Sequence, residues 1–207
     1  MITIIDYSAG NLYNVVSALR KLSYTAVIAN SPNDIENADL ILLPGVGSFD
    51  TAMQNLKKKG MDKILKEKIL SGCPLLGICL GLQLLFPSSE EGKAGERGLD
   101  IIPGKVKRLP SRVKVPHMGW NKVLYRKNEP SRIFSDIPDN TYFYFAHSYY
   151  AEPQAEELVK ATTEYAFPLA AAIKYENIWG LQFHPEKSGS VGLKILANFI
   201  KSHSKEA

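Results

Sequence analysis

The sequence has little cysteine and no long hydrophobic run. Its 207 residues include only two cysteines, Cys73 and Cys79. Two thiols in one short segment do not form the framework of a disulfide-stabilised secreted domain, and they favour a reducing compartment. No apolar run approaches the ~20 residues that span a bilayer, and the opening MITIIDYSAG has neither a basic leader nor a long apolar region. We therefore expect a cytoplasmic protein that does not enter a membrane.

Ligands for metals, phosphates and nucleic acids are also scarce. Four scattered histidines and two cysteines offer no tetrahedral zinc set. The segment Pro44-Gly45-Val46-Gly47 is rich in glycine but lacks the spacing of a phosphate-binding loop, and no G-x-G-x-x-G motif opens a helix. The net charge of +4 is mild, and the lysines lie on helix-like segments without interleaved aromatic residues. We expect no metal, no cofactor and no nucleic-acid partner.

The first half of the chain alternates short apolar runs, rich in β-branched residues, with segments of helical periodicity. The expected strands are 2–6, 25–29, 38–45 and 74–79, and the expected helices are 12–22, 49–59 and 61–70. Strands that alternate with helices pair in parallel through right-handed crossovers, and the helices cover both faces of the sheet. The first half is therefore expected to be α/β.

The second half is expected to consist mainly of strands separated by turns. The strand-like segments are 100–109, 121–125, 141–150, 157–165 and 169–186, the last with a hairpin tip at Glu176-Asn177, and a final helix follows through 191–199. No repeat, low-complexity segment or long linker divides the chain. We expect residues 1–207 to form one α/β domain with a mixed sheet.

The segment Gly77-Ile78-Cys79-Leu80-Gly81 has the spacing of a nucleophile elbow. An apolar strand precedes it and LGLQLLF, which is helix-like, follows, so Cys79 is expected on a sharp turn between the two. Glycines relieve crowding at such a turn, and the amino end of a helix favours thiolate over thiol. The alternative interpretation is a buried cysteine between packing glycines.

A nucleophilic cysteine needs a base and a group that orients the base. His184 ends an apolar strand, and Glu186 follows two positions later. If the backbone stays extended through Pro185, both side chains emerge on one face, and the carboxylate can orient the imidazole. His117 and His147 are as easily hydrogen-bonded structural histidines as functional ones, and His203 lies in a polar tail.

The pair of motifs GICLGLQ and QFHPE resembles the class I, or triad, glutamine amidotransferases, and the resemblance runs from the first strand to the last helix. It implies that Cys79, His184 and Glu186 are the catalytic residues and that L-glutamine is hydrolysed through a thioester on Cys79. It also implies the three-layer fold of that family, with a mostly parallel central sheet and an antiparallel, β-rich second half.

Further segments resemble one branch of that family. DYSAGNLYNV, LPGVGSF, PHMGWN, FAHSYY and HPEKS are similar to the glutaminase subunits of imidazole glycerol phosphate synthases, which act in histidine biosynthesis. This resemblance implies a heterodimer with a separate (β/α)8-barrel cyclase subunit, which receives the ammonia.

The resemblance also implies roles for residues around the nucleophile. The backbone N–H groups of Val46 and Leu80 would form the oxyanion hole, and the Gly45–Val46 peptide is the candidate on/off switch. The implied substrate contacts are Gly45, Gly47, Gln83, Glu91, Ser148 and Tyr149, and the implied partner contacts are Asn11, Asn14, Trp120, Tyr144 and Lys187. For Gln83 and Lys187 the alternative is an ordinary surface residue.

Three other functions are compatible with parts of this pattern. The glutaminase subunits of pyridoxal-phosphate and anthranilate synthases share the triad but not PHMGWN, and the destination of the ammonia separates them. A γ-glutamyl hydrolase would act on peptides without an acceptor subunit. A catalytically silent regulatory module would have no need of Cys79, His184 and Glu186, which this chain retains.

Overall fold

The computed structural model describes residues 1–8, 12–92, 96–125 and 132–203. Asn11, one of the expected partner contacts, lies outside the described residues. No helix in the described part of the chain is both long and apolar enough to cross a membrane.

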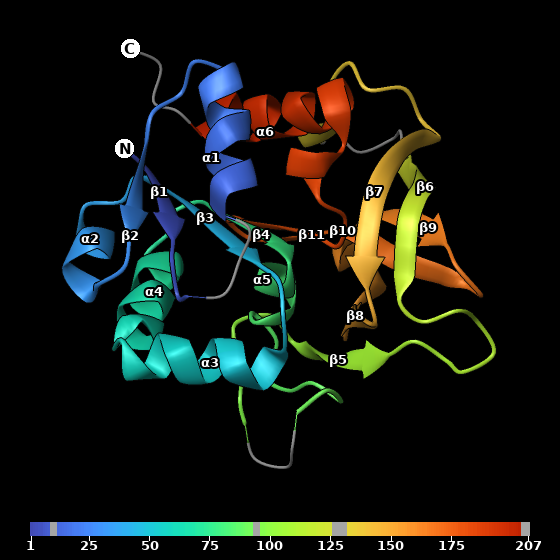
Figure 1. Ribbon diagram of the computed structural model, residues 1–207, viewed down its shortest axis with the longest axis horizontal. Coiled ribbons are helices and arrows are strands. Elements are labelled where there is room, and N and C mark those ends of the chain that lie inside the picture. Colours follow the sequence, from blue (N-terminus) through green and yellow to red (C-terminus); the bar gives the residue numbers. More distant parts are fainter. Residues whose placement is uncertain (9–11, 93–95, 126–131, 204–207) are drawn as a thin grey trace.

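A central sheet runs through the molecule (Figure 1). In the described residues it has nine strands in the order β2-β1-β3-β4-β11-β10-β9-β6-β7. Their bounds are β1 Ile2–Ile5, β2 Ala26–Ala29, β3 Leu40–Gly45, β4 Leu75–Cys79, β6 His117–Tyr125, β7 Thr141–His147, β9 Val159–Glu164, β10 Pro168–Tyr175 and β11 Ile178–Leu181. The strands from β2 to β11 in this order pair in parallel, and the rest pair antiparallel. The expected α/β class, with an antiparallel second half, is confirmed.

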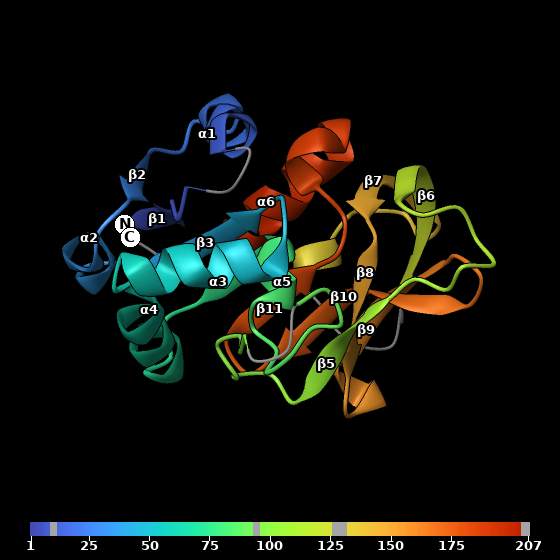
Figure 2. The same ribbon diagram turned by 60° about the horizontal axis from the view of Figure 1, so that its bottom comes forward.

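Helices cover the parallel half of the sheet on both faces, as Figures 1 and 2 show. Helices α1 (Leu12–Lys21) and α6 (Gly189–His203) lie on one face, and α2 (Pro32–Glu36), α3 (Phe49–Lys58) and α4 (Met61–Leu70) lie on the other. Successive strand residues serve the two faces in turn, because side chains alternate along a strand: Leu42 packs with the α1/α6 layer and Leu43 with the α3/α4 layer.

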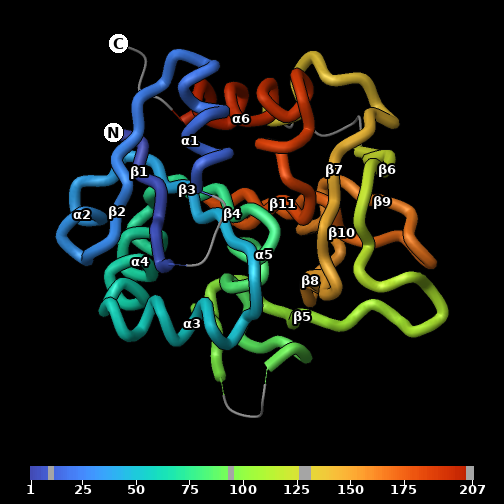
Figure 3. Tube along the Cα trace, viewed as in Figure 1, coloured from blue at the N-terminus to red at the C-terminus, as the bar shows by residue number. Residues whose placement is uncertain are grey.

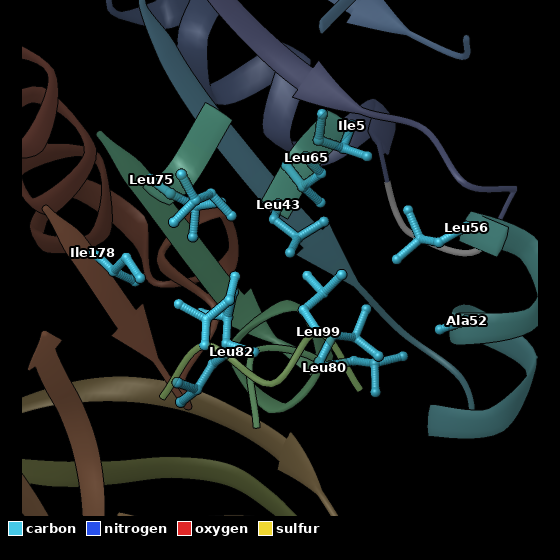
Figure 4. Packing of buried hydrophobic residues seen from close by; sticks show 14 of the residues in the cluster. Ile5, Leu43, Ala52, Leu56, Leu65, Leu75, Leu80, Leu82, Leu99 and Ile178 are labelled. Atoms are coloured by element: carbon cyan, nitrogen blue, oxygen red, sulfur yellow. The ribbon is translucent and has the colours of Figure 1, made fainter. Parts of the chain in front are cut away.

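The core on the α3/α4 side holds the short helix α5 (Leu80–Gln83) in place. Figure 4 shows Leu80 and Leu82 of this helix pointing into the same apolar cluster as Leu43 of β3 and Leu99. All four side chains are almost completely buried. The segment that follows Cys79 is therefore anchored by hydrophobic packing, which fixes the position of the cysteine.

Several expected elements differ from the observed ones. The segment 141–150 is two strands: β7 ends at His147, and β8 (Tyr149–Pro153) pairs instead with β5 (Gly104–Arg108) in a separate two-stranded sheet. No glycine or proline marks that corner in the sequence. Strand β6 begins at His117 rather than residue 121, because it pairs with β7 along its whole first half. Residues 100–102 are not a strand.

Short helical turns account for the other differences. Helix α2 was not expected, although Ser31 and Asp34 form a capping box around Pro32 at its start. Helix α5 has only four residues, shorter than the helix expected from LGLQLLF. Three 3-10 turns, η1 (Arg132–Phe134), η2 (Glu156–Leu158) and η3 (Pro185–Lys187), complete the described elements.

Candidate active site

Cys79 lies on a sharp corner between β4 and α5. Its backbone has φ 53° and ψ −107°, a left-handed conformation that costs a non-glycine residue free energy. The flanking glycines are required by space: a Cβ on Gly81 would lie 1.7 Å from the carbonyl oxygen of Leu43, and one on Gly77 would lie 2.9 Å from the backbone of Leu82. The geometry is that of the expected nucleophile elbow.

His184 reaches this corner because its strand lies beside that of the cysteine. Strands β4 and β11 pair in parallel, with Ile78 opposite Leu181, so the residues after both strands emerge at the same edge of the sheet. In Figure 3 the chain after β4 turns into α5 next to β11, although the two segments come from opposite halves of the sequence.

Glu186 orients the imidazole, but not in the way that the sequence suggested. Its Oε1 is 2.8 Å from Nδ1 of His184. The backbone is not extended through Pro185: residues Pro185–Lys187 form the turn η3, which begins with the proline. The expected extended geometry is therefore wrong, and a tight turn brings the two side chains together.

The environment of His184 favours the charged imidazolium. Burial opposes charge on this ring, which is 1% exposed, but the negative charges of Cys79 and Glu186 outweigh burial and raise its pKa to about 10. Nε2 of His184 is buried and has no hydrogen-bond partner among the described residues. The four-residue helix α5 has only a small dipole. The helix dipole expected at this corner is therefore weak.

A cavity of about 230 Å³ opens beside Cys79. Its volume suits a ligand smaller than the drug-sized molecules that occupy pockets of ~300 Å³ and above. The lining includes eight residues expected from the sequence: Val46, Gly47, Cys79, Leu80, Gln83, Glu91, Ser148 and Tyr149. It also includes four that were not assigned to the substrate site: Pro116, Met118, Ala146 and His147.

The end of β3 lies against the corner. Gly45 is opposite Cys79 in the register of the two strands, yet it does not line the cavity. It packs against the Tyr7 side chain, whose hydroxyl would lie 2.1 Å from a Cβ at this position and donates a hydrogen bond of 2.9 Å to the Pro44 carbonyl. Gly47, the next glycine, has φ 103°. The segment between them brings Val46 to the cavity.

Comparison with known proteins identifies the family. The pattern of the family described as "Glutamine amidotransferase class-I" matches residues 3–202. The chain belongs to the class I glutamine amidotransferase family. The imidazole glycerol phosphate synthase subunit HisH of Moorella thermoacetica is 52% identical over 96% of this chain and 93% of its own length. The subunit of the same name from Methanothermobacter thermautotrophicus is 48% identical over 97% of this chain and 98% of its own.

Solved structures agree on the fold at low sequence identity. A structure of PurLQS from Thermotoga maritima superposes with a TM-score of 0.77 at 16% identity, covering 98% of each chain. A crystal structure of a glutamine amidotransferase has the same TM-score at 15% identity, covering 98% of this chain and 99% of the other. These matches establish the three-layer amidotransferase fold.

Two polar side chains of this amidotransferase are fixed at the cavity wall. Gln83 is buried, so its alternative interpretation as a surface residue is wrong. Its Nε2 donates to the Tyr149 carbonyl at 2.8 Å. The Glu91 carboxylate accepts from the backbone N–H of Phe49, at the start of α3, at 2.7 Å, and burial raises the pKa of Glu91.

Gln182 and Tyr7 also lie at the site, although the sequence motifs did not predict a role for either. Gln182, completely buried, directs Nε2 to the Cys79 sulfur at 3.8 Å and accepts from Gln83 at 3.4 Å. Gln182 is the first residue of the QFHPE motif, two positions before His184, and this proximity in sequence could have indicated a role at the site. Tyr7 gave no such signal, because its contact with Pro44 depends on the pairing of two strands.

The expected partner contacts in the described residues lie near His184 and Glu186. Trp120, 55% exposed, packs edge-to-face on Tyr144, with ring centroids 6.2 Å apart. The Lys187 ammonium lies 5.8 Å from the Tyr144 ring, and the Tyr144 carbonyl accepts from the His184 N–H at 2.8 Å. Asn14 and Glu186 both line a second cavity between α1 and α6. In the described part of the chain, no group of three or more His, Cys, Asp or Glu side chains could hold a metal ion.

Proposed function

We propose that this chain is the glutaminase subunit of an imidazole glycerol phosphate synthase in histidine biosynthesis. It hydrolyses L-glutamine to glutamate and ammonia and passes the ammonia to a separate (β/α)8-barrel cyclase subunit. The observation that carries this proposal is the identity of about one half, along nearly the whole chain, to HisH subunits from different organisms. We further propose that residues 1–207 act as one catalytic domain in the cytoplasm.

Cys79 is the nucleophile of the first half-reaction. Its thiolate attacks the side-chain amide carbon of glutamine, and the carbonyl oxygen becomes an oxyanion. The N–H groups of Leu80 and Val46 stabilise that charge. His184, as imidazolium, gives its proton to the departing nitrogen, the C–N bond breaks, and ammonia leaves behind a γ-glutamyl thioester on Cys79. The cavity at the Cys79 corner supports this assignment, since Val46 and Leu80 both line it.

Water completes the reaction. Neutral His184 takes a proton from a water molecule as the oxygen attacks the thioester carbon, and collapse of the second oxyanion breaks the C–S bond. Glutamate is released, and the thiolate–imidazolium pair forms again. Glu186 holds Nδ1 of His184 protonated, which directs Nε2 to the reacting atoms.

The α-ammonium group of glutamine needs hydrogen-bond acceptors or a negative charge, and its α-carboxylate needs hydrogen-bond donors or a positive charge. The half-buried Glu91 carboxylate is our candidate for the ammonium group, and Gly47 and Gln83 line the same cavity. Gly45, which does not line the cavity, acts on substrate binding only through the position of Val46. The backbones of Ser148 and Tyr149, which also line the cavity, supply hydrogen bonds to the ligand. The cyclase contacts Asn11, Asn14, Trp120, Tyr144 and Lys187; among those in the described residues, the exposed Trp120 is suited to an interface.

The test is glutamate release from L-glutamine by the purified chain, alone and then mixed with the cyclase subunit and its nucleotide ligand. We expect slow hydrolysis alone and strong stimulation in the mixture, because the oxyanion peptide is switched through the interface. Full activity alone would favour a self-sufficient γ-glutamyl hydrolase. No activity in either condition would contradict the proposal.

A further inference from the structure

Two histidines that the proposed chemistry does not use form a buried pair beside the cavity. His117 at the start of β6 and His147 at the end of β7 lie opposite each other across the two antiparallel strands. Nδ1 of His117 is 2.9 Å from Nε2 of His147, and both rings are buried. His117 is stacked between Phe145 and Tyr165, with centroid distances of 4.8 and 3.9 Å.

The neighbours of the pair fix the position of each proton. Nδ1 of His147 is 2.9 Å from the Tyr149 carbonyl oxygen, which can only accept, so Nδ1 is protonated. Nε2 of the neutral ring then accepts from Nδ1–H of His117. Nε2 of His117 in turn accepts from the Asn121 amide at 3.3 Å, and the same amide donates to the Glu164 carbonyl at 2.9 Å.

Both rings are held neutral. Burial lowers the pKa of His117 to about 4 and, with the nearby His117 and His184, lowers that of His147 to about 3. The pair is therefore a hydrogen-bond relay with one direction, from Asn121 through both imidazoles to the Tyr149 carbonyl. Neutral rings in such a chain fit a structural role in holding the backbone and do not fit acid–base catalysis at neutral pH.

The relay ends on the cavity wall. The Tyr149 carbonyl accepts a second hydrogen bond from Gln83, and His147, Ser148 and Tyr149 line the cavity in succession. We propose that His117 and His147 are positioning residues, which hold the Ser148–Tyr149 backbone in the geometry that binds glutamine. This inference rests on the proposed function, because it takes glutamine as the occupant of the cavity.

A pair of substitutions at one site tests the last bond of the relay. His147→Leu removes the donor to Tyr149, whereas the amide nitrogen of His147→Asn can replace Nδ1. With the full chain and its cyclase, we expect His147→Leu to raise KM for glutamine about tenfold while kcat changes far less, and His147→Asn to keep KM near the wild-type value. The pH profile of kcat should not move in either variant.

His203 provides the matched control, because its Nδ1 also bonds a backbone carbonyl, that of Phe199 at 2.8 Å, at the end of α6. His203→Leu and His203→Asn should leave KM unchanged. Equal KM values for the two His147 variants, or a shift in the pH profile of kcat, would overturn the positioning role.

Imidazole nitrogen NMR separates this inference from the proposed function. Both rings should show the Nδ1–H tautomer in the wild-type chain, and a Nε2–H tautomer at either position would overturn the relay. Failure of the wild-type chain and cyclase to hydrolyse glutamine would instead contradict the proposed function. The measured tautomers would still show whether the hydrogen-bond relay exists.

Discussion

Cys79, the proposed nucleophile, has a backbone conformation that few non-glycine residues adopt. We expect Cys79→Ala to reduce glutamate release below detection, because no other thiol lines the cavity in the described residues. Assembly with the cyclase should persist, since the side chain is buried away from the surface. The matched control is Cys73→Ala, at the only other cysteine, which should retain activity. Measurable turnover by the Cys79 variant would mean that the nucleophile is wrongly assigned.

The carboxylate of Glu186 is one of the charges that keep His184 protonated. Glu186→Gln preserves the size of the side chain but removes that charge, so the pKa of His184 should fall toward its ordinary value of 6.5. We expect kcat to fall by about 10²-fold or more, because the imidazole is no longer held in one tautomer. The measurement is the pH dependence of kcat, with Glu157→Gln as an exposed control. An unchanged profile would contradict the orienting role of Glu186.

The buried histidine pair should make stability sensitive to acid. The pKa values of His117 and His147 in the folded chain, about 4 and about 3, lie below the unfolded value of 6.5. Below pH 6.5 the unfolded state therefore binds more protons, and stability falls as the pH falls, by up to about 1.4 kcal/mol per pH unit for each histidine. Urea midpoints at pH 7 and 5 measure this loss. His147→Leu should reduce the slope; a slope equal to that of the wild-type chain would contradict the assignment.

At the level of secondary-structure elements, the end of β3 is fixed by the preceding strand. Tyr7, just after β1, donates to the Pro44 carbonyl directly before the candidate switch peptide. Tyr7→Phe removes only the hydroxyl and frees that carbonyl, so we expect a loss of roughly 1–3 kcal/mol in the free energy of unfolding. The ratio of glutaminase rates with and without cyclase should also fall, because the switch is no longer restrained. An unchanged ratio of rates would mean that Tyr7 does not restrain the switch peptide. Tyr24→Phe, in a partly buried loop, is the control.

The contact between α5 and β3 leaves no space for a side chain at Gly81. A Cβ there would overlap the Leu43 carbonyl oxygen, a backbone atom that cannot rotate away. We expect Gly81→Ala to destabilise the fold by more than about 3 kcal/mol and to abolish activity. Thermal unfolding measures the first effect. Gly72→Ala is the control, because Gly72 has φ 94° but open space around it. That substitution therefore measures the cost of backbone strain without a steric overlap. A fully stable Gly81→Ala chain would contradict the close packing.

Local patterns predicted most of the elements and the sharp turn at Cys79, because both depend on neighbours in sequence. The parallel strands are continuous apolar runs, and Cys79 is marked by its glycines. The extended backbone expected at Ser148 and at Pro185 is wrong. The chain turns at Ser148 because β8 pairs with the distant strand β5, and Pro185 begins the turn η3. Gln182, Tyr7 and the His117–His147 pair depend on contacts between distant segments. The same limit applies to Gly45, whose neighbour is a tyrosine hydroxyl and not the cavity.

On the scale of the whole molecule, an exposed aromatic surface lies on β6 and β7 beside the site. Trp120 and Met118 are 55% and 65% exposed, respectively. We expect Trp120→Ala to weaken association with the cyclase by about 2 kcal/mol or more, because aromatic side chains that become buried at the centre of an interface contribute that much to binding. Calorimetric titration measures this change. Leu70→Ala, equally exposed at the end of α4, should have no effect; equal losses for both would contradict the interface.

The order of strands in the sheet also determines when the enzyme can first act. Strand β11 lies between β4 and β10, and it is the last strand to be synthesised. The proposed nucleophile, Cys79, is therefore synthesised long before the proposed base, His184, which follows β11 in the chain. A nascent or truncated chain that ends before His184 holds a cysteine with no proton acceptor. In the proposed mechanism, release of ammonia therefore requires the completed fold.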